Sequence, residues 1–65
     1  MILYKYGMRL RGFSIGCQPM KNFYERRDDD GKSGRRYHDI ILYTEKLTDK
    51  DLRDYELDFL GEVEE

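Results

Sequence analysis

The fold is decided by the stretch Ile2-Leu3-Tyr4-Lys5-Tyr6-Gly7-Met8-Arg9-Leu10-Arg11. Its even positions are all apolar or aromatic, and three of its odd positions, Lys5, Arg9 and Arg11, are basic. Successive side chains on a strand point to opposite faces of the sheet, so alternation with a period of two is typical of a half-buried strand. We therefore expect a β-strand over residues 2–11.

Two further stretches have strand character. Residues 22–27 form a short polar segment, and residues 37–43 contain the run Ile40-Ile41-Leu42-Tyr43. That run is apolar on both faces, which predicts a strand in the centre of the sheet. Residues 28–34 are rich in Asp and Gly and predict the solvated tip of a hairpin. Residues 12–19, with two glycines and the only proline, predict an irregular connection.

The last expected element is a helix that starts after residue 47. Thr48 is a suitable N-cap, and Asp51, three residues later, completes an approximate capping box. Gly61 would end the helix and leave residues 62–65 as an acidic tail. A stripe at helical spacing would pack on the sheet: Leu52, Tyr55 and Phe59.

Together these elements predict one α+β domain over residues 1–65, with a three-stranded, mainly antiparallel sheet and one C-terminal helix packed on it. The β-β-β-α plan leaves the order of the strands open. The predicted core draws on the first strand, the third strand and the helix: Tyr4, Tyr6, Met8, Leu10, Ile40, Leu42, Leu52, Tyr55 and Phe59.

The composition predicts a small core under a charged surface. Hydrophobic residues make up 38% of the 65 residues and charged residues 40%. Cys17 is the only cysteine, so an internal disulfide is excluded and a reducing cytoplasm is expected. We find no apolar run long enough for a membrane span and no signal peptide, and we expect a complete short reading frame.

The net charge of −2 hides an asymmetry along the chain. Residues 1–38 contain nine Lys or Arg and four Asp or Glu, a balance of +5, whereas residues 39–65 contain three and ten, a balance of −7. Two interpretations are open: two ordinary solvated faces, or a dipolar surface that takes part in binding.

One pair of leucines does not fit a single buried stripe on the expected helix. Leu57 and Leu60 are rotated away from it and define a second stripe. Either Leu60 is partly buried and Leu57 is an ordinary exposed leucine, or the two mark an interface with a partner protein or a second copy.

Familiar ligand motifs fail on spacing. Gly31-Lys32-Ser33 resembles the end of a phosphate-binding P-loop, but Arg26 stands where the motif requires its first glycine. Asp28 and Asp30 resemble part of a calcium loop, but Tyr37 stands where the closing glutamate belongs. Weak cation binding by the aspartates remains an alternative.

Catalysis is not expected. Cys17 and His38 are the only residues of their types, and single copies in a minimal domain are usually structural. A closed zinc site would require four ligands. The sequence therefore predicts a non-enzyme without a metal or cofactor.

A cationic and aromatic set makes nucleic-acid binding an alternative function. A sheet that carries cations and aromatic rings can hold phosphates and stack bases. The interleaved acidic residues and the net negative charge argue against it. The candidate residues are Arg9, Arg11, Tyr24, Arg26, Arg27, Arg35, Arg36 and Tyr37.

Two blocks of the sequence carry a resemblance to a known group. They are residues 6–19, and residues 37–43 running into Leu47-Thr48 and Asp54-Tyr55-Glu56-Leu57. Together they resemble small proteins of phages and mobile elements in gut Firmicutes, some of them related to phage defence-against-restriction proteins. The resemblance implies an accessory that acts against host defence, and it implies no catalytic residues.

The leading functional hypothesis is a protein-interaction module that serves a mobile element, alone or as a homo-oligomer. It rests on the dipolar charge distribution, the second leucine stripe and the lack of a catalytic constellation. The sequence leaves the identity of the protein partner open.

Overall fold

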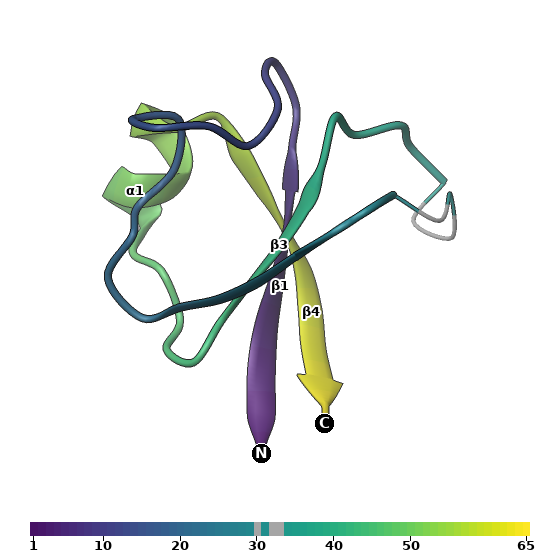
Figure 1. The fold of residues 1–65 in the computed structure, drawn as a ribbon, viewed down its shortest axis with the longest axis vertical. Coiled ribbons are helices and arrows are strands. Elements are labelled where there is room, and N and C mark those ends of the chain that lie inside the picture. The colour runs from purple at the N-terminus through teal and green to yellow at the C-terminus, as the bar shows by residue number, and fades with distance from the viewer. Residues whose placement is uncertain (30, 32–33) are drawn as a thin grey trace.

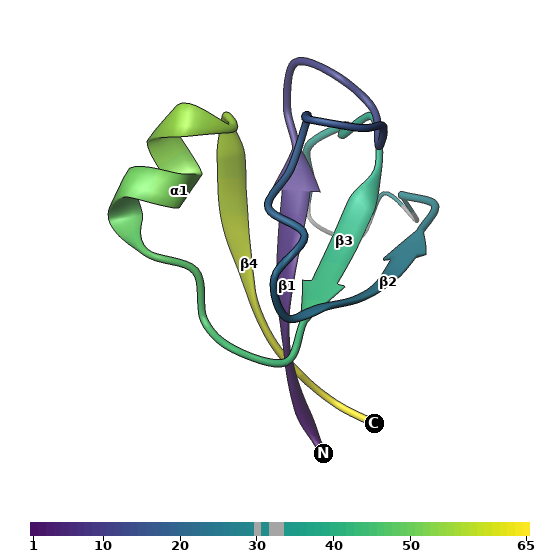
Figure 2. The ribbon, with the colours of Figure 1, turned by 60° about the vertical axis from the view of Figure 1, so that its left-hand side comes forward.

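The computed structural model describes residues 1–29, 31 and 34–65. Four strands form one antiparallel sheet in the order β2-β3-β1-β4. A short helix precedes the last strand, as Figures 1 and 2 show. The elements are β1 (Ile2–Met8), β2 (Phe23–Arg27), β3 (Ile40–Tyr43), α1 (Asp49–Asp54) and β4 (Leu57–Glu64).

The first three strands confirm the expected β-β-β order, with shorter bounds. β1 ends at Met8 rather than at residue 11, and β3 begins at Ile40 rather than at residue 37. All four residues of β3 are buried, and β3 lies between β2 and β1, so its central position is confirmed. β2 and β3 pair antiparallel on either side of the 28–39 loop, as the hairpin predicts.

The expected C-terminal helix is wrong beyond Asp54. Thr48 caps α1, and the reciprocal bonds of a capping box join Thr48 and Asp51 as predicted. The helix then stops, because Glu56 takes a positive φ of 54°, outside the right-handed helical region. Residues 57–64 form an eight-residue fourth strand that pairs with β1 along its whole length.

Gly61 therefore lies inside a strand and does not end a helix. The register pairs Phe59 with Tyr6 and Gly61 with Lys5, so Leu60 is an extra residue on β4 and forms a β-bulge. Gly61 has a φ of 112°, which glycine adopts without steric penalty. The prediction of an acidic tail over residues 62–65 is also wrong, since Glu62 and Glu64 belong to β4.

The main core lies on one face of the sheet, where the 9–22 loop and α1 cover it. The Tyr6 ring meets the ring of Tyr43 edge to face, with centroids 5.7 Å apart. The loop is held by the Tyr43 hydroxyl, which donates to the carbonyl of Pro19 at 2.6 Å. The buried cluster consists of Tyr6, Met8, Ile41, Tyr43 and Leu57, with Tyr4, Phe13, Cys17, Phe23, Leu47, Leu52 and Tyr55 packed against it.

The predicted core is confirmed at Tyr6, Met8, Ile40 and Leu42, all of which are buried. Tyr4, Leu52 and Tyr55 pack at its margin. Two assignments are wrong. Leu10 is 65% exposed because it follows the end of β1, where the alternation no longer applies. Phe59 is 39% exposed because it lies on the edge strand.

Candidate functional site

A carboxylate on β4 collects three of the candidate side chains. Asp58 lies opposite Gly7 and accepts hydrogen bonds from the Tyr37 hydroxyl at 2.9 Å and from Arg35 Nη1 at 2.8 Å. Arg9 Nε forms an ion pair with the same carboxylate at 3.4 Å. Burial raises the pKa of Tyr37, and the hydrogen bond to Asp58 raises it further. The carboxylate thus fixes the 28–39 loop to the sheet.

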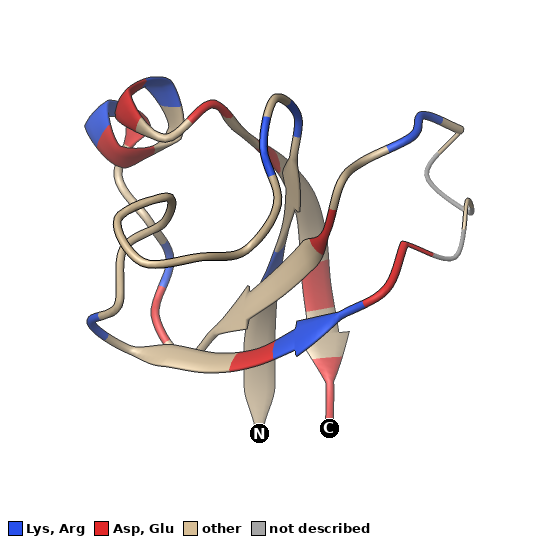
Figure 3. Cartoon of the chain, turned by 45° about the horizontal axis from the view of Figure 1, so that its top comes forward, with Lys and Arg blue, Asp and Glu red and all other residues tan. Residues whose placement is uncertain are grey.

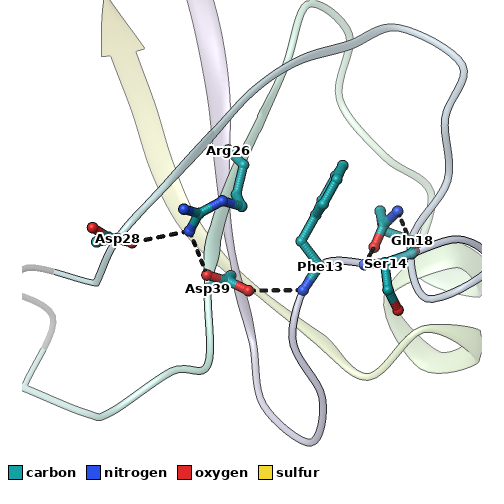
Figure 4. A network of polar contacts seen from close by, with 6 residues as sticks. All are labelled: Phe13, Ser14, Gln18, Arg26, Asp28 and Asp39. Carbon is teal, nitrogen blue, oxygen red and sulfur yellow. Dashed lines mark hydrogen bonds and ion pairs between the residues drawn. The ribbon is translucent and has the colours of Figure 1, made fainter.

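Arg26 belongs to a second network, drawn in Figure 4. Its Nη1 lies 2.7 Å from Asp39 Oδ1 and 2.9 Å from Asp28 Oδ1. The other oxygen of Asp39 accepts the backbone N–H of Phe13 at 2.7 Å. These bonds join β2, the start of β3 and the 9–22 loop, so Arg26 serves the fold.

Arg27, the neighbour of Arg26 on β2, forms a third network, which extends to the residue after β4. Its guanidinium binds Glu25 on its own strand and Glu65 beyond the end of β4. The hydrogen bonds that Arg27 donates to Glu65 and, second, to Glu25 raise the pKa of Arg27, and the same bond to Glu65 lowers the pKa of Glu65. The sheet is therefore coiled enough for its two edge strands to be joined by an ion pair.

Arg9 and Arg11 hold the turn between α1 and β4. Both the backbone N–H and the Nε of Arg9 donate to the carbonyl of Glu56, each at 3.3 Å. Arg11 Nη2 lies 2.7 Å from Glu56 Oε2, an ion pair without hydrogen-bond geometry. The left-handed conformation of Glu56 is thus supported from two sides.

Arg36 differs from the other candidate arginines. It is exposed and forms no hydrogen bond or ion pair with any residue in the described ranges. It lines an open depression of about 420 Å³. Among the described residues, the rest of its lining is formed by Arg9, Asp28, Asp29, Tyr37 and His38.

The two candidate tyrosines have different environments. Tyr37 is half-buried, and its ring lies so close to β1 that a Cβ at Gly7 would come within 2.5 Å of it. Tyr24 is 46% exposed, at a register shift between Phe23 and Glu25 on the edge strand β2. Of the two rings, that of Tyr24 is the more exposed, and base stacking requires an accessible ring.

The proposed leucine interface rests on a helical stripe that does not exist. Both leucines lie on β4, where Leu57 is 3% exposed and belongs to the core, and Leu60 is half-buried at the bulge. Leu57 therefore presents no surface to a partner. In the sequence, the apolar residues Leu57 and Phe59, two positions apart, indicate a strand. The spacing of three residues between Leu57 and Leu60 also fits a helix, so the pattern did not distinguish the two.

No group of three or more His, Cys, Asp and Glu in the described ranges is placed to hold a metal ion. Asp30, Lys32 and Ser33, which belong to the two ligand-loop resemblances, lie outside the described residues. Cys17 is half-buried, with its Sγ 3.0 Å from Ser14 Oγ. The helix in the described part of the chain is neither long nor apolar enough to cross a membrane.

The fold and the ion pairs define a class: a small α+β domain with a four-stranded antiparallel sheet whose surface arginines are largely bound by its own carboxylates. The family model described as "Defence against restriction A C-terminal" matches residues 1–61, and the chain belongs to this family. Comparisons with curated proteins and with solved structures gave no match.

Proposed function

We propose that this domain is a phage or mobile-element accessory that acts against host restriction by binding a protein, without catalysing a reaction. The match to the defence-against-restriction family over residues 1–61 carries the biological part of this proposal. Host restriction enzymes act in the cytoplasm, so we place the domain there when it works. The partner is a protein of the restriction system, bound by one copy of the domain or by a homo-oligomer.

The use of the charged side chains supports protein binding as the mode. Five of the six candidate arginines are bound by carboxylates of the same molecule, so a phosphate backbone would have to compete with partners already in place. Figure 3 shows basic and acidic segments interspersed, with acidic residues on β4 and basic residues on β2. Such a surface suits a protein partner with a complementary pattern of charges.

The first experiment is phage plating on a restricting host and on a matched host that lacks the restriction enzyme. Expression of the domain should raise the plating of a restriction-sensitive phage on the first host only. The purified domain should then elute together with the restriction enzyme on a sizing column without DNA. Unchanged plating on the restricting host would reject the anti-restriction role.

Nucleic-acid binding remains the alternative. It predicts that labelled DNA or RNA binds the domain with an affinity that falls steeply with salt, because each neutralised phosphate releases counterions. The double variant Arg35/Arg36→Ala should weaken that binding. If the domain meets the restriction enzyme only when DNA is present, this alternative replaces protein binding.

A further inference from the structure

The depression beside the 28–39 loop is lined by two arginines, Arg9 and Arg36. Arg36 contributes a guanidinium that no described residue binds. Arg9 uses its Nε for Asp58 and for the Glu56 carbonyl, and no bond within the described ranges involves its two terminal nitrogens. The volume, about 420 Å³, lies within the range of about 300–1,000 Å³ that is usual for ligand sites.

His38 is a third residue of the depression with nitrogen atoms in its side chain. The His38 N–H donates to the carbonyl of Met8 at 2.9 Å, and the Met8 N–H donates to the carbonyl of Asp39 at the same distance. These two bonds fix the backbone of residue 38 against the end of β1. His38, which lines the depression together with Arg9, is therefore held in place at its backbone.

The two carboxylates in the lining already have partners. Asp28 accepts Arg26 Nη1 at 2.9 Å. Asp29 accepts the backbone N–H groups of Gly31 and Tyr37 at 3.0 and 2.9 Å. These bonds, first the one from Tyr37, lower the pKa of Asp29, and the positive charges of Lys5 and Arg36 lower it further, so it is ionised at neutral pH. The negative charges of the two carboxylates weaken anion binding here, but neither carboxylate forms a hydrogen bond with Arg9 or Arg36.

We propose that this depression binds a phosphate group, with Arg36 as the main donor and with Arg9 and His38 beside it. A guanidinium presents paired N–H donors that match phosphate oxygens, and such charge-assisted bonds are among the stronger polar contacts in proteins. The site is independent of the protein-binding proposal, since it uses no contact with a restriction enzyme. It takes a free phosphate ion or a phosphate of a nucleic-acid strand.

The test is an NMR titration of the ¹⁵N-labelled full chain, with inorganic phosphate, a mononucleotide and a short single-stranded oligonucleotide as separate probes. Backbone signals of residues 36–38 should shift and saturate. Arg36→Ala should weaken binding about tenfold, the equivalent of one charge-assisted hydrogen bond. Asp28→Asn, which removes a negative charge from the lining, should tighten it.

Arg53→Ala is the matched control. Arg53 is an exposed arginine on α1 that is likewise unpaired in the described ranges, so its loss changes the net charge equally but away from the depression. Saturation with inorganic phosphate assigns a free-ion site, and saturation with the oligonucleotide alone assigns a strand phosphate. Equal weakening by Arg36→Ala and Arg53→Ala, or no saturable shift with any probe, would overturn the proposal.

Discussion

At Gly7, strand β1 carries no side chain, and the ring of Tyr37 occupies the space. Three ring atoms lie within 2.5 to 2.7 Å of the position that a Cβ would take, closer than real Cβ contacts allow. From there the Tyr37 hydroxyl reaches Asp58 on the neighbouring strand. The glycine is therefore required by close packing and lets the 28–39 loop dock on the sheet.

Gly7→Ala is expected to destabilise the domain by about 1–3 kcal/mol, because the added methyl group displaces a packed ring. Chemical denaturation followed by circular dichroism measures the change. In a Tyr37→Ala background the same substitution should have a much smaller effect, since the ring is gone. Equal effects in both backgrounds would mean that the strand itself, and not the ring, requires glycine at position 7.

At the scale of elements, the segment after α1 takes the conformation that long-range pairing favours. Residues 57–64 contain leucines at helical spacing as well as the alternation of Leu57 and Phe59. In the structure β1 supplies a complete set of strand partners for them. A strand makes its hydrogen bonds only with a neighbouring strand. The spacing of side chains within residues 57–64 therefore does not by itself decide between helix and strand.

Leu57 and Leu60 should respond differently to truncation. Leu57→Ala is expected to cost about 2–5 kcal/mol of stability, because it opens a cavity in the core. Leu60→Ala should cost about 1 kcal/mol or less, since its side chain is half-buried at a bulge. Urea denaturation of both variants tests this. Comparable small effects would contradict the placement of Leu57 in the core.

The cap of α1 can be tested in the same way. Thr48→Ala removes the side-chain acceptor of the Asp51 N–H and is expected to destabilise the domain by about 1 kcal/mol. Thr48→Ser keeps an oxygen in the same place and should retain most of the stability. Thermal unfolding of the two variants makes the comparison, and an equal loss for both would argue against a capping role.

At the scale of the whole molecule, the two ends of the chain and both sheet edges are joined. The terminal ammonium of Met1 donates to the carbonyl of Glu65, and the Glu65 N–H donates to the carbonyl of Met1. Arg27 on β2 binds the Glu65 carboxylate. In Figure 1 both ends lie together below β1 and β4. Glu65 thus ties strands from opposite ends of the sheet order.

The ion pair between Arg27 and Glu65 predicts that the stability of the domain depends on pH in the acidic range. The bond from Arg27 lowers the pKa of Glu65 below its ordinary value of 4.5. A group whose pKa is lowered by folding stabilises the fold above its ordinary pKa, and the contribution disappears as pH falls through the lowered value. Glu65→Gln should therefore flatten the fall in stability below pH 4.5, measured by denaturation at a series of pH values. An unchanged profile would show that the ion pair contributes nothing in solution.

The sequence by itself determined the local features of this protein. The alternation in residues 2–8, the doubly apolar run at Ile40–Tyr43 and the capping box at Thr48 and Asp51 all lie where the pattern predicted them. Each of these depends on neighbours within a few residues, and so the spacing of side chains encodes it. The resemblance to defence-against-restriction proteins was also readable from the sequence, and the family match supports it.

Only the tertiary structure decided the rest. The fourth strand depends on β1, whose paired residues lie 49 to 62 positions away in the chain, and the role of each arginine depends on which carboxylate the fold brings to it. A row of cations in a sequence looks alike whether its members are paired or free. The fold engages five candidate arginines in ion pairs and leaves Arg36 without a hydrogen bond or ion pair to a described residue, because ion pairs form between residues that are distant in the chain but close in space.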